Sequence, residues 1–225
     1  NRNYQLIEYS KYYFYTRIMD LHNKHKHLIQ LINQYGNEGQ PFFLIVDFLV
    51  EKPLLFLPEE LLPQGIEVVF PTFQNSIHAG LHQPFITLKK YPITLDEYEQ
   101  AYQIVQQHLR FGNSFLTNLC CKTPITTNCT VEQLFYQANA PYKIKFKDEW
   151  ICFSPERFIQ IDGRYIHAFP MKGTIDAAIP NAKEEILSNP KEIAEHYTIV
   201  DLIRNDLSMV SKKVEVKTFR FINEI

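Results

Sequence analysis

Apolar residues recur every three or four positions along several stretches of the chain, which is the spacing of one face of an α-helix. Thr94 followed by Glu97 is the signature of a capping box, and Asn189 followed by Pro190 is typical of a helix start. These signals predict four helices: Arg17–Tyr35, Thr94 to a stop at Gly112, Thr130–Ala138, and Pro190–Leu207. In the second helix we expect a buried apolar stripe of Leu95, Tyr98, Tyr102, Val105 and Leu109.

Apolar and β-branched runs between the helices predict strands. Residues Phe42–Val50 are nearly all apolar, so we expect a central strand there. The remaining runs are Pro53–Phe56, Glu67–Phe70, Phe85–Lys89, Phe115–Lys122, Tyr142–Phe146, Trp150–Phe153, Arg157–Ile161, Tyr165–Phe169 and Val214–Phe219. Helices and strands alternate in an irregular order, which favours an α+β fold with large, mostly antiparallel sheets flanked by helices.

Composition and charge exclude several classes of function. The chain has 225 residues, with 23 basic and 25 acidic side chains and a net charge of −2, so we expect no nucleic acid partner. Neither glycine-rich phosphate motif occurs, and the longest apolar run is too short to cross a bilayer, so we expect no membrane partner. The four cysteines lack CxxC spacing, which favours a reducing compartment, and we expect a cytoplasmic protein.

Three short motifs carry the candidate chemistry. They are SPERF (Ser154–Phe158), PMKGT (Pro170–Thr174) and AEHYTIVDLIRNDL (Ala194–Leu207). Lys172 stands between a proline and a glycine, on a predicted tight bend. A lysine held there away from water could lose its proton and act as a nucleophile.

The acidic residues of the third motif do not form one pair. Asp201 follows Glu195 by six residues, which places it about 120° around the helix from Glu195. Arg204 and Asn205 stand three and four residues after Asp201, so we expect a local, structural interaction among them.

In this order, the three motifs resemble those of the chorismate-utilising enzymes. That family includes anthranilate synthase component I, aminodeoxychorismate synthase component I and the isochorismate synthases. Gly112–Leu119 (GNSFLTNL) is similar to a further family segment, GD-x-Y-x-x-NL, with Asn118 kept, Asn113 in place of the acid and Phe115 in place of the tyrosine. The resemblance implies the chorismate-binding (anthranilate synthase component I-like) fold. Residues 1–225 would form the N-terminal and central part of one such domain, with its C-terminal part absent.

Lys172 assigns the branch within this resemblance. Anthranilate and isochorismate synthases carry alanine at this position, whereas aminodeoxychorismate synthases carry PIKGT. The resemblance then implies attack of Lys172 on C2 of chorismate, with Glu156 as the acid, and amination at C4 toward p-aminobenzoate and folate. It also implies substrate binding by Gly173, Thr174 and Asn118, and a Mg²⁺ ligand at Glu195. Ammonia would come from a glutamine amidotransferase subunit.

Three departures from the family pattern stand near these motifs. Phe169 and Ile175 replace arginines on either side of PMKGT, and Thr198 replaces a methionine of the helix motif. One alternative is anthranilate or isochorismate synthase activity. The other is a non-enzyme reading, in which the chain is an inactive fragment or binding domain.

Overall fold

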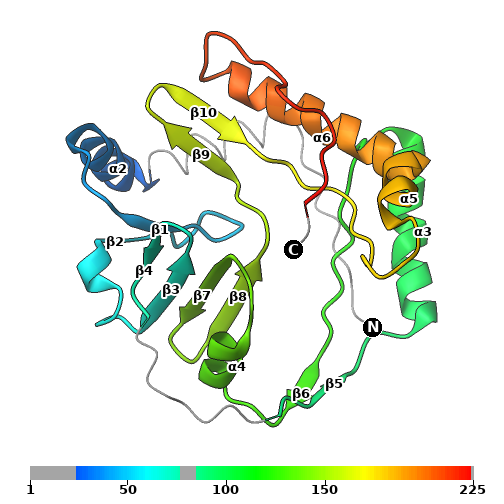
Figure 1. The fold of residues 1–225 in the computed structure, drawn as a ribbon, viewed down its shortest axis with the longest axis horizontal. Helices are drawn as coiled ribbons and strands as arrows, with labels where there is room; N and C mark the ends of the chain where they lie inside the picture. The colour runs from blue at the N-terminus through cyan, green and yellow to red at the C-terminus, as the bar shows by residue number, and fades with distance from the viewer. Residues whose placement is uncertain (1–23, 77–84, 224–225) are drawn as a thin grey trace. The chain divides into compact units, whose positions relative to one another are not determined.

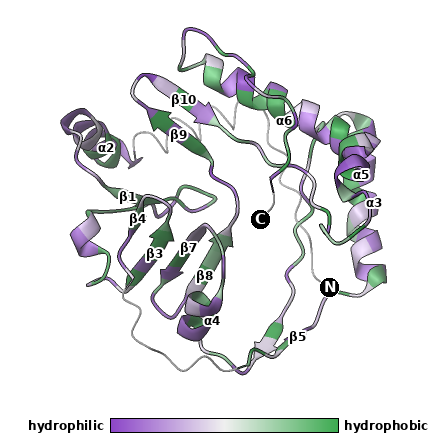
Figure 2. Ribbon diagram, in the orientation of Figure 1, coloured by the Kyte–Doolittle hydropathy of each residue, from purple (hydrophilic) through white to green (hydrophobic). Residues whose placement is uncertain are grey.

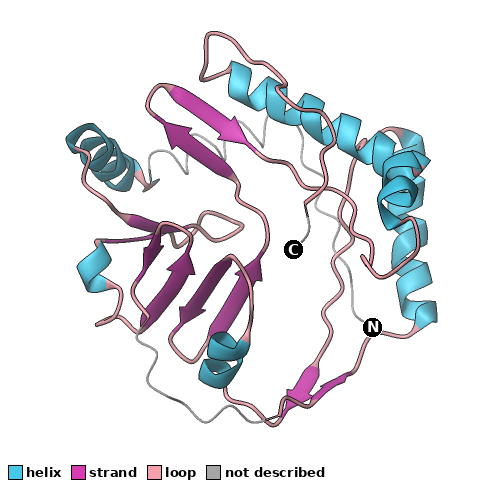
Figure 3. Cartoon of the chain, viewed as in Figure 1, coloured by secondary structure: helices cyan, strands magenta, loops and turns pink. Residues whose placement is uncertain are grey.

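The computed structural model describes residues 24–76 and 85–223, and the chain divides into two compact units, residues 1–76 and 77–225. Each unit contains helices and strand pairs, labelled in Figure 1 and coloured by type in Figure 3. The predicted α+β class with antiparallel pairing is therefore confirmed. Within the described ranges, no helix is both long enough and apolar enough to cross a membrane.

Over residues 24–76, the first unit contains one α-helix and two strand pairs. Its elements are α2 (Lys26–Glu38), β1 (Phe43–Ile45), β2 (Leu54–Phe56), the 3-10 turn η1 (Pro58–Glu60), β3 (Ile66–Phe70) and β4 (Phe73–Gln74). Strand β1 pairs with β2, and β3 with β4, both antiparallel. The helix continues past the predicted end at Tyr35 and stops at Gly39, whose φ of 66° is left-handed. The part of the first predicted helix before Lys24 lies outside the described residues.

Asp47 ends the strand predicted over Phe42–Val50. Its carboxylate accepts hydrogen bonds from the backbone N–H groups of Leu49, Glu51 and Lys52, at 3.0, 3.1 and 2.6 Å. These bonds lower the pKa of Asp47, and the bond from the Lys52 N–H has the largest effect. They also turn the chain after Ile45, so the prediction of a long central strand is wrong.

In the described part of the chain, four apolar side chains are completely buried. Leu61, Ile66 and Val68 form the core of the first unit, and Phe135 of helix α4 is buried in the second. Along β3 three consecutive residues are buried, so this strand is covered on both faces.

The second unit contains the residues of all three sequence motifs. Its elements are β5 (Leu88–Lys90), α3 (Leu95–Phe111), β6 (Ile125–Thr127), α4 (Val131–Gln137), β7 (Tyr142–Phe146), β8 (Trp150–Ser154), β9 (Ile159–Asp162), β10 (Tyr165–Ala168), α5 (Ala182–Ser188) and α6 (Pro190–Ser208). The pairs β5–β6, β7–β8 and β9–β10 are all antiparallel. Helix α5 runs directly into α6, which carries the third motif.

The predicted helix starts in this unit are confirmed. Thr94 Oγ1 accepts from the Glu97 N–H at 3.2 Å, and Glu97 Oε2 accepts from the Thr94 N–H at 3.0 Å. The Asn189 side chain accepts from the N–H groups of Lys191 and Glu192, at 3.0 and 3.2 Å. Each cap provides a partner for N–H groups that have none within the helix.

Two predicted strands are wrong. Residues 115–122 and 214–219 have no ladder partner in the described part of the chain, and Phe115 is 94% exposed.

The predicted stripe of α3 is also not buried, since Leu95 and Tyr102 are 71% and 44% exposed. Figure 2 shows that apolar and polar residues do alternate around this helix. An apolar stripe is buried only where another element covers it, and the described residues leave this one largely open.

Asn128 connects the segment before helix α3 with the segment after it. Its Oδ1 accepts from the Thr87 N–H, and its Nδ2 donates to the Phe85 carbonyl, both at 2.8 Å. The amide thereby extends the β5–β6 pair by one more step. An asparagine used in this way has a structural role.

Lys143 caps the carboxyl end of α4 from a buried position. Its Nζ donates to the Phe135 and Ala138 carbonyls, at 3.2 and 3.0 Å. We expect Lys143→Met to lower the free energy of unfolding by about 1–3 kcal/mol, because these carbonyls lose their donor. Urea denaturation measures the change, and Lys147→Met, an exposed lysine in the β7–β8 turn, is the control. Equal stability of the two variants would contradict the capping role.

The same lysine predicts a pH dependence. Burial lowers the pKa of Lys143 from 10.5, so the folded protein loses this proton at a lower pH than the unfolded chain. Between the two values the unfolded chain binds more protons, and stability rises with pH. The stability of the wild type relative to Lys143→Met should therefore increase as the pH approaches 10.5. A flat difference over this range would contradict the assignment.

Candidate active site

Glu156 connects the first motif to the second. Strand β8 ends at Ser154, whose hydroxyl accepts from the Glu156 N–H at 3.1 Å and donates to the Glu156 carbonyl at 3.0 Å. This turn directs the Glu156 carboxylate across the chain, where Oε1 accepts from the Met171 N–H at 3.2 Å. The residue before Lys172 is therefore held by the carboxylate predicted to be catalytic.

The Phe169 departure forms a second connection between the same motifs. The Arg157 guanidinium lies over the Phe169 ring, with 4.3 Å between its central carbon and the ring centroid. The Arg157 side chain also donates to Gln160 Oε1. An arginine next to Glu156 and an aromatic ring before Pro170 thus form a cation–π pair. This contact gives Phe169 a packing role in place of the arginine expected from the resemblance.

The segment Pro170–Thr174, hereafter the Lys172 bend, also contacts helix α6. Gly173 has a φ of +75°, and a methyl group added to it would lie 2.6 Å from Glu192 Oε2. Glu192 lies in the first turn of α6. The second motif therefore contacts the helix of the third motif through a glycine that leaves room for a carboxylate.

Two carboxylates of α6 share one lysine. Lys191 Nζ lies 3.4 Å from Glu192 Oε1 and 3.3 Å from Glu195 Oε1. The hydrogen bonds to Glu195 and then to Glu192, with the charges of both, raise the pKa of Lys191. Glu195, the predicted metal ligand, thus lies beside Glu192, which the sequence-based site did not include. The spacing of three residues between the two glutamates on a predicted helix could have suggested it.

The other predicted site residues lie as follows. Lys172 is half-buried between its anchored neighbours Met171 and Gly173, and Thr174 at the end of the bend is exposed. Asn118 is exposed in an irregular segment, where its carbonyl accepts from Cys120 Sγ at 3.9 Å. Within the described residues, Glu156 contacts the Lys172 bend directly, whereas Glu195 is connected to it only through Lys191 and Glu192. These contacts do not connect Asn118 to this group.

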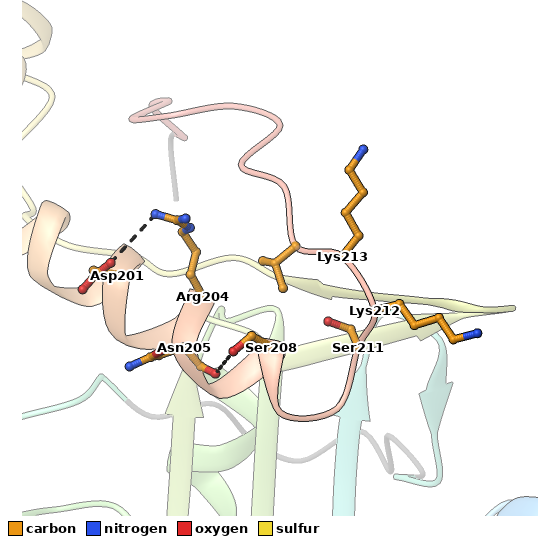
Figure 4. Close-up of a pocket in the computed structure, with 8 residues that line it drawn as sticks. Asp201, Arg204, Asn205, Ser208, Ser211, Lys212 and Lys213 are labelled. Carbon is orange, nitrogen blue, oxygen red and sulfur yellow. Dashed lines mark hydrogen bonds and ion pairs between the residues drawn. The ribbon is translucent and has the colours of Figure 1, made fainter.

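The carboxyl end of α6 forms a separate, polar pocket. Arg204 Nη1 lies 3.8 Å from Asp201 Oδ1, which confirms the local interaction predicted for Asp201. The pocket has a volume of about 270 Å³, and Lys212 and Lys213 of its lining point outward in Figure 4. Glu192 and Asn205 are 13 residues apart on one helix, or about 20 Å. This pocket is therefore distinct from the site around Lys172.

The pair Glu192 and Glu195 has the donor chemistry of a magnesium site. Both Oε1 atoms already face one cation, the Lys191 ammonium, so the two carboxylates converge. Among the described residues no cluster of three or more His, Cys, Asp or Glu side chains could hold a metal ion. Mg²⁺ keeps several waters and accepts one or two protein carboxylates, so this pair fits it when a ligand or water supplies the remaining oxygens.

Gly173→Ala tests the contact between the bend and α6. A left-handed backbone costs alanine about 1–2 kcal/mol, and the new methyl group would also displace the Glu192 carboxylate. Gly163→Ala is the matched control, with a φ of +56° and no neighbour within 4 Å of its added methyl. We expect both variants to lose similar stability in urea denaturation, and Gly173→Ala alone to lose whatever activity this candidate site supports. If Gly163→Ala lost as much activity as Gly173→Ala, the contact between Gly173 and Glu192 would have no specific role.

The sequence profile of the chorismate binding enzyme family matches residues 62–225, which is more than half of the chain. A protein of Haemophilus influenzae named "Uncharacterized PabA-like protein" is 44% identical over 200 residues, covering 89% of this chain and 61% of that protein. No solved structure matches the chain.

More distant relatives have named activities. Aminodeoxychorismate synthase component 1 of Escherichia coli is 31% identical over 138 residues, covering 56% of this chain and 30% of that protein. An anthranilate synthase component I-like protein of Synechocystis is 31% identical over 134 residues, covering 53% of this chain and 28% of that protein. The chain spans about three fifths of the length of the Haemophilus relative, which is 61% covered.

Proposed function

This chain belongs to the chorismate binding enzyme family, and from that membership we propose that it is part of an aminodeoxychorismate synthase, which aminates chorismate at C4. The observation that carries the proposal is the position of Lys172. It lies between Met171, whose N–H is held by Glu156, and Gly173, which contacts Glu192. The similarity to the Escherichia coli enzyme named for this reaction supports the same branch.

The proposed reaction uses Lys172 as nucleophile and Glu156 as acid. The Lys172 amine attacks C2 of chorismate, the two conjugated ring double bonds shift, and the 4-hydroxyl leaves. Glu156 donates the proton with which that hydroxyl becomes water. Ammonia then attacks C4, both double bonds shift back, and the C2–N bond breaks to release Lys172. In the net reaction, chorismate and ammonia give 4-amino-4-deoxychorismate and water.

The contacts of Glu156 and Lys172 suit these roles. Glu156 Oε1 accepts a hydrogen bond from the N–H of Met171, the residue before Lys172. The proposed acid is therefore attached to the residue that precedes the proposed nucleophile. Arg157, stacked on Phe169, supports the other end of the same segment. Two attachments from SPERF to the residues before Lys172 therefore restrict the motion of the bend.

The remaining roles concern binding. Glu195 and Glu192 would hold Mg²⁺, which when bound would neutralise the ring carboxylate of the substrate. Gly173 and Thr174 of the bend would line the substrate site, with Asn118 brought to it in the whole protein. Ammonia would come from a glutamine amidotransferase subunit.

The product identifies the reaction. We would incubate the full-length protein with chorismate, an ammonium salt and Mg²⁺, and identify the product by chromatography and mass. The expected product is 4-amino-4-deoxychorismate. Anthranilate or isochorismate would place the protein in another branch and remove the nucleophilic role of Lys172. No product from a folded protein would favour a domain without this activity.

A further inference from the structure

Lys191 occupies the place between the two acidic side chains proposed to hold the metal ion. Its Nζ is within 3.4 Å of Oε1 of both Glu192 and Glu195. The Lys191 side chain is 73% exposed, whereas Glu192 and Glu195 are 20% and 35% exposed. The lysine therefore covers the carboxylates from the solvent side and can leave without disturbing packed groups.

The position of Lys191 in the helix is unfavourable for helix stability. It follows Pro190 in the first turn of α6, where the helix dipole favours negative charge. Glu192 already satisfies that preference, and the Asn189 side chain caps the free N–H groups. A cation at this point is therefore explained by the two carboxylates and not by the helix itself.

Glu192 connects the ion pair with Lys191 to the Lys172 bend. Its Oε1 faces Lys191, while its Oε2 lies where a Gly173 side chain would be. Without a cation between them, two carboxylates one helical turn apart repel each other. A cation on Oε1 therefore helps to keep Glu192 directed toward the bend.

We propose that Lys191 is an internal counterion of the magnesium site: its ammonium bridges Glu192 and Glu195 while the metal is absent and swings into solvent when Mg²⁺ binds. This inference rests on the proposed function, because it takes these two carboxylates as the metal ligands. Lys191 then competes with the metal, both by occupying the site and by its positive charge. The metal site remains assembled before Mg²⁺ arrives, at the expense of affinity.

The test is direct metal binding to the full-length protein without substrate. Mn²⁺, followed by electron paramagnetic resonance, reports free and bound ion, and Mg²⁺ is then added as competitor. We expect Lys191→Met to bind about two- to fivefold more tightly, the range that a partly exposed ion pair is worth. Lys191→Arg keeps the charge and should not bind more tightly than the wild type. Lys183→Met, an exposed lysine of α5, should bind as the wild type does.

Glu195→Gln separates the two ideas. If it loses metal binding while Lys191→Met binds more tightly, the counterion role is supported. Loss of binding in Glu195→Gln together with unchanged or weaker binding in Lys191→Met would overturn the counterion role and leave the metal site intact. If Glu195→Gln binds metal as the wild type does, both the metal site and the counterion role are wrong, while the product assay still decides the reaction.

Discussion

Lys172→Ala in the full-length protein is expected to reduce formation of 4-amino-4-deoxychorismate by about 1,000-fold or more, while leaving the fold intact. The proposed reaction proceeds through a bond between this amine and the substrate, and removal of a nucleophile leaves only the weak residual effect of binding. The measurement is the steady-state rate of product formation with chorismate, ammonium ions and Mg²⁺.

The surroundings of Lys172 make this a clean substitution. Met171 and Gly173 are fixed through their own contacts, to Glu156 and Glu192, so alanine between them removes the amine and little else. Lys183→Ala, on the exposed side of α5, controls for the loss of a positive charge nearby in the sequence. If Lys172→Ala still aminates chorismate at a comparable rate, Lys172 is not the nucleophile. The family membership of the chain would be unaffected.

Glu156→Gln should separate proton donation from positioning. A glutamine Oε1 can still accept the Met171 N–H bond, so the bend should keep its place, but the amide cannot donate a proton to the leaving hydroxyl. Loss of a general acid typically lowers a rate by about 100- to 10,000-fold, and we expect the decrease in kcat with little change in KM for chorismate. Initial rates over a range of chorismate concentrations give both constants.

A second variant at the same position sharpens the test. Glu156→Ala loses both the acid and the hydrogen bond that holds Met171, so its KM should rise as well. Glu149→Gln, an exposed glutamate in the β7–β8 turn, is the control and should behave as the wild type. Near-wild-type kcat in Glu156→Gln would show that the proton comes from another group.

Local signals account for the parts of the fold that the sequence predicted well. The starts at Thr94 and Asn189 depend on side chains within three residues of the N–H groups they cap, so the necessary atoms are adjacent in sequence. The strand predicted over residues 115–122 depends instead on a distant partner, which the described residues do not provide. A β-rich run indicates that a segment can pair, but not that a partner is present.

The candidate site shows the same division. Glu156, Lys172 and Glu195 could be selected from their motifs, and the structure places their segments together. The contact of Glu192 with Gly173, 19 residues earlier in the chain, could not be predicted from either motif alone. The Arg157–Phe169 pair is similar, because an arginine expected at 169 is replaced by an aromatic ring that another arginine covers.

The β5–β6 pair has a consequence for the order of folding events. Its strands are separated by residues 91–124, whereas β7–β8 and β9–β10 are joined by turns of a few residues. Hairpins form within microseconds, but closing a loop of this length has a larger entropic barrier. The pair should therefore form after the folding transition state, with Asn128 as its last attachment. Asn128→Ala would then accelerate unfolding and leave the folding rate almost unchanged, corresponding to a φ-value near zero.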